Sequence, residues 1–288
     1  SRDDRRELNY HTALSFAVPE GGYGGGWFLS QGFGAQYLRY VNLSWFNLGR
    51  GSAMKRTFAD TEIDAPMFTV CNYCGHLDSQ KGANSKWDHR PWCPKRTARE
   101  EESVTVALTR TLQTQGVLLH VPVTLTAGDK STIPSLTAAI KLGFKEVLGG
   151  DPDHLGVVTV RVPDDRGGTV EALLMHDTVP GGTGYLSQFA SPADVRRLLE
   201  MAYNRVVACT CKDDERLACP ECLLPYTRPQ QVDVTSRASA ERALRAILSN
   251  QDHPSPEADP LTVAWDPQEE APQLDTASNL EVRFREML

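Results

Sequence analysis

The pattern of hydrophobic and polar positions predicts strands and helices that alternate along the middle of the chain. Residues 117–126 form a short apolar run suited to a buried strand, and residues 133–149 follow with apolar positions at helical spacing. Two β-branched runs, 157–162 and 170–177, are separated by turn residues and predict a hairpin. This order predicts an α/β (α+β) fold with a mixed sheet and packed helices.

Two further helices are predicted in the C-terminal half. Ser191 as N-cap and Pro192 at the first helical position favour a helix over residues 191–206, with Leu198 toward the core. Residues 234–248 have a second helical pattern, and we expect this helix to pack back on the sheet.

The two ends of the chain differ from its middle. Residues 1–57 combine a glycine-rich loop with an aromatic and β-branched run, which predicts a β segment without a core of its own. The proline-rich, acidic stretch 252–275 predicts a linker or mobile tail, and residues 282–288 form a short amphipathic piece that could dock. Because Ser1 is not a methionine, we expect the sequence to be a piece of a longer protein.

The last four cysteines have the spacing of metal ligands. The chain reads Cys209-x-Cys211, then seven residues, then Cys219-x-x-Cys222, so four thiols lie within fourteen residues. Four closely spaced thiolates are the ligand set of a tetrahedral structural zinc. The sequence therefore predicts a Zn²⁺ site with four cysteine ligands.

The first three cysteines form a second set. Cys71-x-x-Cys74 is followed, after a loop of fourteen residues, by His89-x-x-x-Cys93. Three thiolates and one imidazole also complete a zinc tetrahedron. His76 competes with His89 for the fourth position, and the spacing alone leaves both open.

Disulfides and catalytic zinc are the alternatives, and the sequence disfavours both. Seven is an odd number of cysteines, and the chain opens with a charged run rather than a signal sequence. A catalytic zinc keeps an open position, whereas four ligands in each cluster leave none. A nucleic-acid deaminase is excluded because no histidine is followed two residues later by glutamate.

Charge is distributed unevenly along the chain. The net charge is −7, but residues 250–288 carry all of this imbalance, and residues 81–99 are strongly basic. Basic side chains interleaved with tryptophans can neutralise phosphates and stack on single-stranded bases. The candidate DNA-binding residues are Lys81, Lys86, Trp87, Arg90, Trp92, Lys95, Arg96 and Arg99. The alternative interpretation is a solvated zinc loop whose tryptophans pack locally.

Other signatures of catalysis or of a membrane protein are missing from the sequence. No Gly-x-x-x-x-Gly-Lys-[Ser/Thr] occurs, so we expect no ATPase activity from this chain itself. A hydrolase built on His176 and Asp177 has no supporting Gly-x-Ser-x-Gly. No apolar stretch approaches the length of a membrane span, and reduced zinc thiolates indicate a cytoplasmic protein.

The order of the motifs suggests a family. A Cys-x-x-Cys-Gly…His-x-x-x-Cys knuckle precedes a strand that ends in the glycine-rich turn 177–184, followed by a helix and the cysteine quartet of residues 209–222. In this order the chain resembles the MrfA-like zinc-binding domain, found at the C-terminal end of superfamily 2 DNA helicases and in the related subunit of the DISARM phage-defence system. The resemblance covers roughly residues 65–250. It implies that the quartet binds zinc, and it implies the same for the upstream knuckle.

The sequence therefore predicts four parts and a function. The parts are an N-terminal β-rich segment (1–64), the first zinc knuckle with its basic loop (65–110), the α/β zinc-binding domain (111–250) and the acidic tail (251–288). We expect a non-catalytic accessory domain of a bacterial DNA helicase or of a helicase-associated antiviral defence complex. Its expected partners are single-stranded or junction DNA and a superfamily 2 motor in cis or in trans, with no membrane. The alternative is a zinc-stapled protein-protein scaffold without DNA contact.

Overall fold

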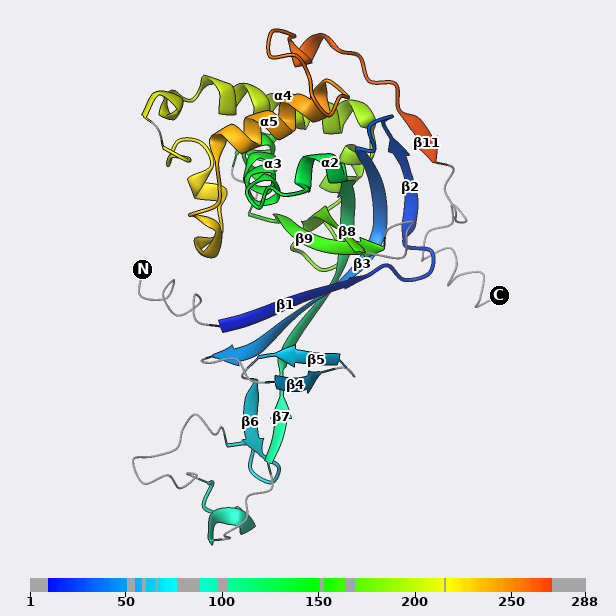
Figure 1. Cartoon of the computed structure of the whole chain (residues 1–288). Coiled ribbons are helices and arrows are strands. Elements are labelled where there is room, and N and C mark those ends of the chain that lie inside the picture. The colour runs from blue at the N-terminus through cyan, green and yellow to red at the C-terminus, as the bar shows by residue number, and fades with distance from the viewer. Residues whose placement is uncertain are drawn as a thin grey trace, which may run out of the picture. The chain divides into compact units, whose positions relative to one another are not determined.

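The chain divides into two compact units. Unit 1 comprises Ser1–Ser15 and Ser44–Thr111, and unit 2 comprises Phe16–Leu43 and Leu112–Leu288. The computed structural model (Figure 1) describes residues 10–50, 55–58, 61–65, 67–76, 89–97, 103–150, 153–163, 169–214 and 216–270. The four-part division expected from composition remains a prediction, and these two units partition the chain differently because each combines segments that are far apart in the sequence.

The structure contains strands and helices in the predicted α+β mixture. The strands are β1 (Tyr10–Ala17), β2 (Tyr23–Phe28), β3 (Gly34–Arg50), β4 (Lys55–Phe58), β5 (Thr61–Asp64), β6 (Phe68–Cys71), β7 (Ser103–Val106), β8 (Leu108–His120), β9 (Leu155–Pro163), β10 (Thr169–Asp177) and β11 (Gln268–Glu270). The α-helices are α2 (Val123–Thr126), α3 (Thr132–Leu148), α4 (Pro192–Ala208) and α5 (Arg237–Leu248). Short 3-10 turns are η2 (Pro94–Thr97), η3 (Tyr185–Ala190), η4 (Thr210–Asp214), η5 (Leu224–Tyr226), η6 (Pro229–Gln231) and η7 (Pro260–Thr262).

A large antiparallel sheet organises unit 2. Its strand order is β11-β2-β3-β8-β10-β9, and β1 pairs with β3. The predicted hairpin is confirmed, because β9 and β10 pair in antiparallel register with Leu173 opposite Thr159. On its other edge β10 pairs with β8, where Leu173 faces Leu119. The predicted α+β class is therefore confirmed.

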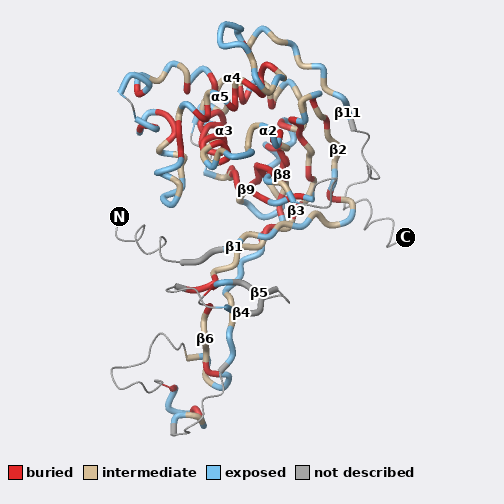
Figure 2. Tube along the Cα trace, in the orientation of Figure 1, coloured by how far each residue is buried: buried red, intermediate tan, exposed pale blue. Residues whose placement is uncertain are grey.

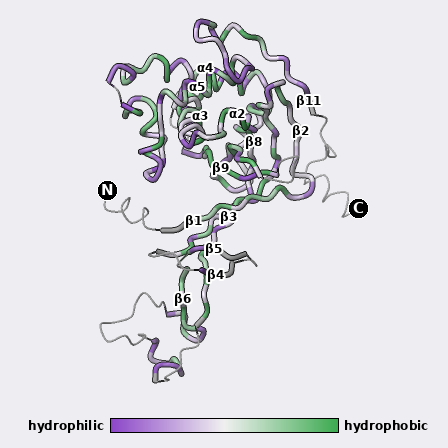
Figure 3. Tube along the Cα trace, viewed as in Figure 1, coloured by the Kyte–Doolittle hydropathy of each residue, from purple (hydrophilic) through white to green (hydrophobic). Residues whose placement is uncertain are grey.

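The main core of unit 2 lies between this sheet and the helices, which cover one face of it (Figure 1). Leu173 and Met175 of β10 pack in the same buried cluster as Ile140 of α3 and Leu198 of α4. Leu174 points to the opposite face, because side chains alternate along a strand, and it is fully buried too. Figure 2 shows the buried residues along α3 and β8, and Figure 3 shows hydrophobic stretches along β9. The central strands are therefore buried on both faces, which explains their continuous apolar runs.

Three helices lie close to their predicted ranges, and one predicted strand is too long. The strand expected over residues 117–126 ends at His120, and the single helical turn α2 follows Pro122, which has no amide hydrogen for a strand ladder. Ser191 occupies the N-cap of α4, but its side chain forms no capping hydrogen bond. Ser236 caps α5 by accepting a hydrogen bond from the Ser239 amide.

The expectation of a linker or mobile tail is wrong for residues 252–270. The Trp265 ring lies 5.6 Å from Trp27 and 5.8 Å from Phe33, measured between ring centroids. Its Nε1–H donates a hydrogen bond to the Leu248 carbonyl at 3.1 Å, and the guanidinium of Arg196 lies 5.3 Å from its ring. Strand β11 then pairs with β2. One tryptophan therefore docks an acidic, proline-rich segment whose composition indicates no core. Residues 282–288 lie outside the described residues.

Unit 1 is built from hairpins. Strand β4 pairs with β5, and β6 pairs with β7, both in antiparallel register. A small buried cluster of Leu48, Ala65 and Met67 supports them. The β6–β7 hairpin carries Cys71 at the end of β6. The local chain path therefore delivers the first cysteine of the upstream knuckle from the end of a paired strand.

Within the described part of the chain, no helix combines the length and the apolar character needed to cross a membrane.

Replacing Trp265 by alanine should lower the free energy of unfolding of the zinc-loaded chain by roughly 2 to 4 kcal/mol, because it removes a partly buried ring from the core. Urea unfolding monitored by circular dichroism measures the change. Glu257→Ala, at an exposed position of the same segment, is the control and should leave the midpoint unchanged. A Trp265→Ala midpoint equal to wild type would contradict the docking.

Candidate metal centres

The four-cysteine cluster is assembled from two short segments of unit 2. Cys209 directly follows α4 as its C-cap, and Cys211 lies in η4. Cys219 and Cys222 lie in the turn before η5, where the Cys219 carbonyl accepts hydrogen bonds from the amides of Cys222 and Leu224. This tight turn directs two sulfurs toward the pair that follows the helix. The structure therefore brings together all four residues predicted from the spacing.

The distances within this cluster fit one zinc ion. Ligands bound at about 2.3 Å in a tetrahedron place their sulfurs about 3.8 Å apart. The Sγ atom of Cys209 lies 3.4 Å from those of both Cys211 and Cys219. The Cys222 Sγ lies 3.8 Å from Cys211 and 3.5 Å from Cys219. All seven cysteines are free, which agrees with the preference for metal ligation over disulfides.

The cluster is part of the main core of unit 2. Cys211, Cys219 and Cys222 are buried, and the neighbouring Leu223 is fully buried. Burial raises the pKa of the Cys211 and Cys222 thiols. Burial also acts to raise the pKa of Cys219, but the backbone amide of Glu221 and the neighbouring thiols outweigh it and lower this pKa to about 7. Crowded thiolates repel one another, and a bound divalent cation removes that repulsion.

The upstream knuckle is assembled in unit 1. After Cys71 the chain turns sharply: the amide of Gly75 donates to the Cys71 carbonyl at 2.9 Å, and the amide of Cys71 donates to the His76 carbonyl at 3.0 Å. Gly75 has φ +68°, which favours glycine at this point of the turn. His89 and Cys93 come from the segment that precedes η2. The turn thus presents Cys71 and Cys74 to the second half of the site.

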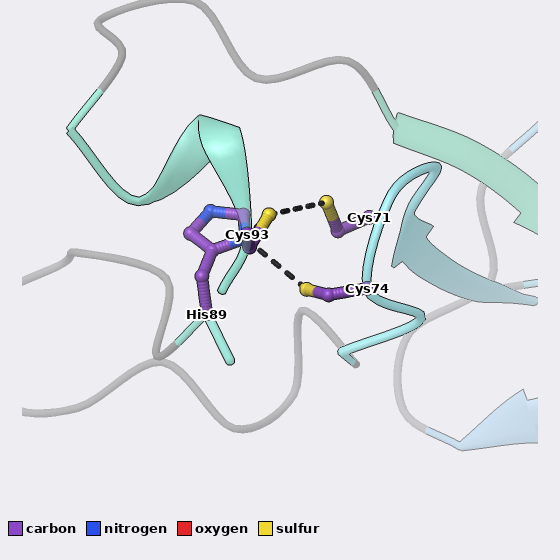
Figure 4. A group of neighbouring side chains, drawn as sticks. All are labelled: Cys71, Cys74, His89 and Cys93. Atoms are coloured by element: carbon purple, nitrogen blue, oxygen red, sulfur yellow. Dashed lines mark hydrogen bonds between the residues drawn. The ribbon is translucent and has the colours of Figure 1, made fainter. Parts of the chain in front are cut away.

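The upstream knuckle also fits one zinc ion, with His89 as its nitrogen ligand. The three sulfurs and the His89 ring point toward one another (Figure 4). The Nδ1 atom of His89 lies 3.4 Å from the Cys74 Sγ and 3.5 Å from the Cys93 Sγ, and the sulfurs of Cys71 and Cys93 are 3.9 Å apart. A tetrahedral zinc with a nitrogen ligand near 2.0 Å requires about 3.6 Å between nitrogen and sulfur. His76 contributes its backbone carbonyl to the turn, and its side chain lies outside the cluster.

The thiols of this knuckle differ in acidity. Burial raises the pKa of Cys93. Burial acts in the same direction on Cys74, but hydrogen bonds from the backbone of Arg90 and His76, together with the His89 side chain, lower the pKa of Cys74 to about 6. A thiol already ionised near neutral pH is a ready ligand for zinc. Four ligands per cluster leave no open position for a catalytic water.

The structure describes four of the eight candidate DNA-binding residues, Arg90, Trp92, Lys95 and Arg96. Lys81, Lys86, Trp87 and Arg99 lie outside the described residues. Arg90, Trp92 and Arg96 are exposed around Cys93, and 68% of the Trp92 surface is accessible. Sequence reasoning missed Tyr73, which is also exposed and whose ring centroid lies 5.2 Å from the Lys95 ammonium. The sequence did contain a signal for Tyr73: it lies between the ligands Cys71 and Cys74, and a shared metal site places that loop beside residues 89–97.

The glycine-rich turn 177–184 forms around the carboxylate of Asp177. Its oxygens accept hydrogen bonds from the amides of Val179 at 2.9 Å and Thr183 at 2.6 Å, and from the Thr183 hydroxyl. Gly181, Gly182 and Gly184 all have φ between +81° and +85°. Burial acts to raise the pKa of Asp177, but these hydrogen bonds outweigh it and lower the pKa. The geometry is that of a tight strand-to-helix turn.

Comparisons with known proteins agree with the motif order. Residues 136–223 match the family model of the MrfA Zn-binding domain. Two crystal structures of the DUF1998 helicase MrfA are similar to the chain. The DNA-bound structure has a TM-score of 0.45 and is 15% identical to this chain; the match covers 83% of this chain and 25% of the helicase chain. The structure with DNA and AMPPNP has a TM-score of 0.33 and is 13% identical; that match covers 82% of this chain and 22% of the helicase chain. The chain therefore spans about a quarter of those helicase chains. No curated protein matches it.

Replacing Cys219 by serine should remove one of two zinc ions and strongly destabilise unit 2, because structural zinc contributes on the order of 10 kcal/mol to its folded site. Elemental analysis and thermal unfolding measure the two effects. Cys74→Ser is the matched control: it should also lose one zinc ion but leave the helical signal of unit 2 intact. Two zinc ions retained in Cys219→Ser would refute the assignment.

Replacing Asp177 by alanine should cost roughly 2 kcal/mol or more, because it leaves the amide donors of the turn without their acceptor. Since its pKa is lowered, the ionised carboxylate stabilises the fold at neutral pH, and this contribution is lost as pH falls below about 4. Urea unfolding at pH 7 measures the cost. Asp233→Ala, at an exposed position, controls for charge, and equal stability of the two variants would argue against the role of Asp177 in the turn.

Proposed function

Since residues 136–223 match the family model of the MrfA Zn-binding domain, we propose that this chain is a non-catalytic, zinc-binding accessory part of a DNA helicase or of a helicase-associated antiviral defence complex. The family match carries this proposal. The match covers most of α3, the β9–β10 hairpin, α4 and all four cysteines of the quartet. The family takes its name from MrfA, a DUF1998 helicase, which supports association with a helicase motor in cis or in trans.

The metal role that we propose is structural in both sites. Cys209, Cys211, Cys219 and Cys222 bind one zinc ion, and Cys71, Cys74, His89 and Cys93 bind the other. The burial of the quartet and its saturated ligand set support this role, because a catalytic zinc needs an open, accessible position. When bound, zinc cross-links the separate segments that carry its ligands and neutralises the charge of the thiolates.

The DNA contact that we propose lies on the upstream knuckle. Arg90 and Arg96 are exposed on either side of Cys93, and Trp92 presents most of its surface to solvent. Cations of this kind neutralise phosphates, and an exposed indole can stack on an unpaired base. Single-stranded or junction DNA is therefore the proposed ligand. The Lys95 ammonium over the Tyr73 ring supports the same surface, because it adds charge and aromatic area.

The setting that we propose is the bacterial cytoplasm, where thiolate zinc sites stay reduced. DNA repair and antiviral defence are both processes in which a helicase accessory domain could act on DNA. The domain would hold DNA or position the motor, and the motor would supply ATP hydrolysis.

The double variant Arg90→Ala with Lys95→Ala should bind labelled single-stranded DNA more weakly than the wild-type chain. Each lost phosphate contact should reduce the slope of log affinity against log salt by about 0.7. Fluorescence anisotropy of the zinc-loaded protein across a salt series measures both effects. The matched control removes two exposed arginines from unit 2, Arg161→Ala with Arg197→Ala, and should keep the wild-type slope.

Trp92→Ala separates stacking from charge in the same assay. It should weaken binding by about 1 to 3 kcal/mol without changing the salt slope, because a stacked base carries no counterion term. An unchanged affinity and slope in the double variant would reject the DNA contact. Binding of the chain to a helicase motor without DNA would then favour the protein-protein scaffold.

A further inference from the structure

Unit 2 contains a pocket that neither zinc site uses. Its volume is about 460 Å³, within the range of small-ligand sites. Two cations, Lys141 and Arg228, line it together with Asp153. Its apolar walls are Phe144, Leu155, Pro225, Tyr226 and Pro229. Helix α3 supplies one wall and the segment around η5 supplies another.

The described part of the chain offers neither cation a charged partner within ion-pair distance. Among the residues that the structure describes, none forms a hydrogen bond or an ion pair with the Lys141 ammonium or the Arg228 guanidinium. Asp153 lines the same pocket but is not within ion-pair distance of either. The described lining residues carry two positive charges and one negative charge, an excess of one positive charge.

The energetics of Lys141 follow from this arrangement. Lys141 is half-buried in the middle of α3, and burial lowers its pKa, while the positive charge of Arg228 lowers it further. Like charges that share a pocket repel, and the repulsion is relieved when an anion binds between them. An arginine and a lysine together are a frequent pair for phosphate, because one provides a fork of donors and the other a compact charge.

We propose that this pocket binds the phosphate group of a nucleotide. Lys141 and Arg228 contact the phosphate oxygens, and Tyr226 with Pro225 and Pro229 offers apolar surface to the sugar or base. Free inorganic phosphate shares the charged part of this chemistry. A phosphate flanked by a sugar and a base uses the walls as well, so the nucleotide binds more tightly.

The position of Arg228 depends on the four-cysteine cluster. Only five residues separate it from Cys222, and the Thr227 hydroxyl donates a hydrogen bond to the carbonyl of the fully buried Leu223 at 2.8 Å. The Arg228 carbonyl then accepts a hydrogen bond from the Gln231 amide at 2.8 Å. The chain between the cluster and the pocket is therefore fixed by short local contacts, and the pocket is tested in the zinc-loaded protein.

The test is an NMR titration of the ¹⁵N-labelled, zinc-loaded chain with thymidine 5′-monophosphate and, separately, with inorganic phosphate. Saturable amide shifts are expected at residues 141–144 and 226–228 with both probes, and the nucleotide should bind more tightly. Equal affinity for the two probes would overturn the nucleotide assignment, because the site would then bind the phosphate group alone. No shifts in these segments at millimolar concentrations, or shifts only elsewhere, would overturn the pocket itself.

Three variants make the assignment specific. Lys141→Met and Arg228→Gln should each weaken binding by about tenfold or more, because each removes a charge-assisted contact. Lys145→Met, one turn further along α3 at an exposed position outside the pocket, should bind as wild type. Wild-type affinity in both pocket variants would refute the site.

Stability measurements distinguish a ligand-binding lysine from a purely structural one. Lys141→Met should melt no lower than wild type, because it replaces a half-buried ammonium, which has no ion-pair partner among the described residues, by an apolar side chain. A structural role for Lys141 would instead lower the melting temperature. Arg228 is exposed, so Arg228→Gln should fold in any case.

The variant designed to weaken DNA binding also shows whether the pocket acts independently of the proposed DNA contact. Arg90→Ala with Lys95→Ala changes only unit 1, so it should retain the amide shifts of the pocket. A failure of the DNA contact on the knuckle and a failure of the pocket therefore give different results.

Discussion

Four sulfur atoms set the main constraint on unit 2. Four of the Sγ–Sγ distances within the quartet are 3.4 to 3.8 Å, and the cluster lies in the hydrophobic core. At such separations thiolates repel one another and cannot all be ionised without a cation. A zinc ion converts this repulsion into a cross-link. That cross-link joins the end of α4 to the turn before η5 and so fixes both the last turn of a core helix and the segment that carries Arg228.

The upstream knuckle shows the same constraint with less support from the core. The hydrophobic cluster described around it consists of its own Cys71 and Cys93, with Cys74 packed against them. A loop with so little apolar surface relies on its metal for a defined conformation. The same scarcity of apolar partners leaves Trp92 and Tyr73 exposed. A metal-held loop can therefore present aromatic and basic side chains that an apolar core would otherwise bury.

A negative net charge is compatible with two positively charged sites. The net negative charge is concentrated in the C-terminal segment, where composition opposes a core. The contacts of Trp265 with Trp27 and Phe33, together with the pairing of β11 with β2, dock part of that segment on unit 2. Meanwhile the cations around Cys93 belong to unit 1, and those that line the pocket between α3 and η5 belong to unit 2. The local charge of a surface, rather than the net charge of the whole chain, decides what that surface can bind.

The sequence by itself determined the features that depend on neighbours in the chain. Cysteine spacing predicts the quartet and the three cysteine ligands of the upstream knuckle, and the turn residues after Val162 predict the β9–β10 hairpin, because short loops bring their ends together at little entropic cost. The tertiary structure alone decided between His76 and His89, docked Trp265 on the core, and placed Lys141 beside Arg228. Each of these depends on residues far apart in the chain, and their contacts follow from how helices and sheet pack rather than from any local pattern.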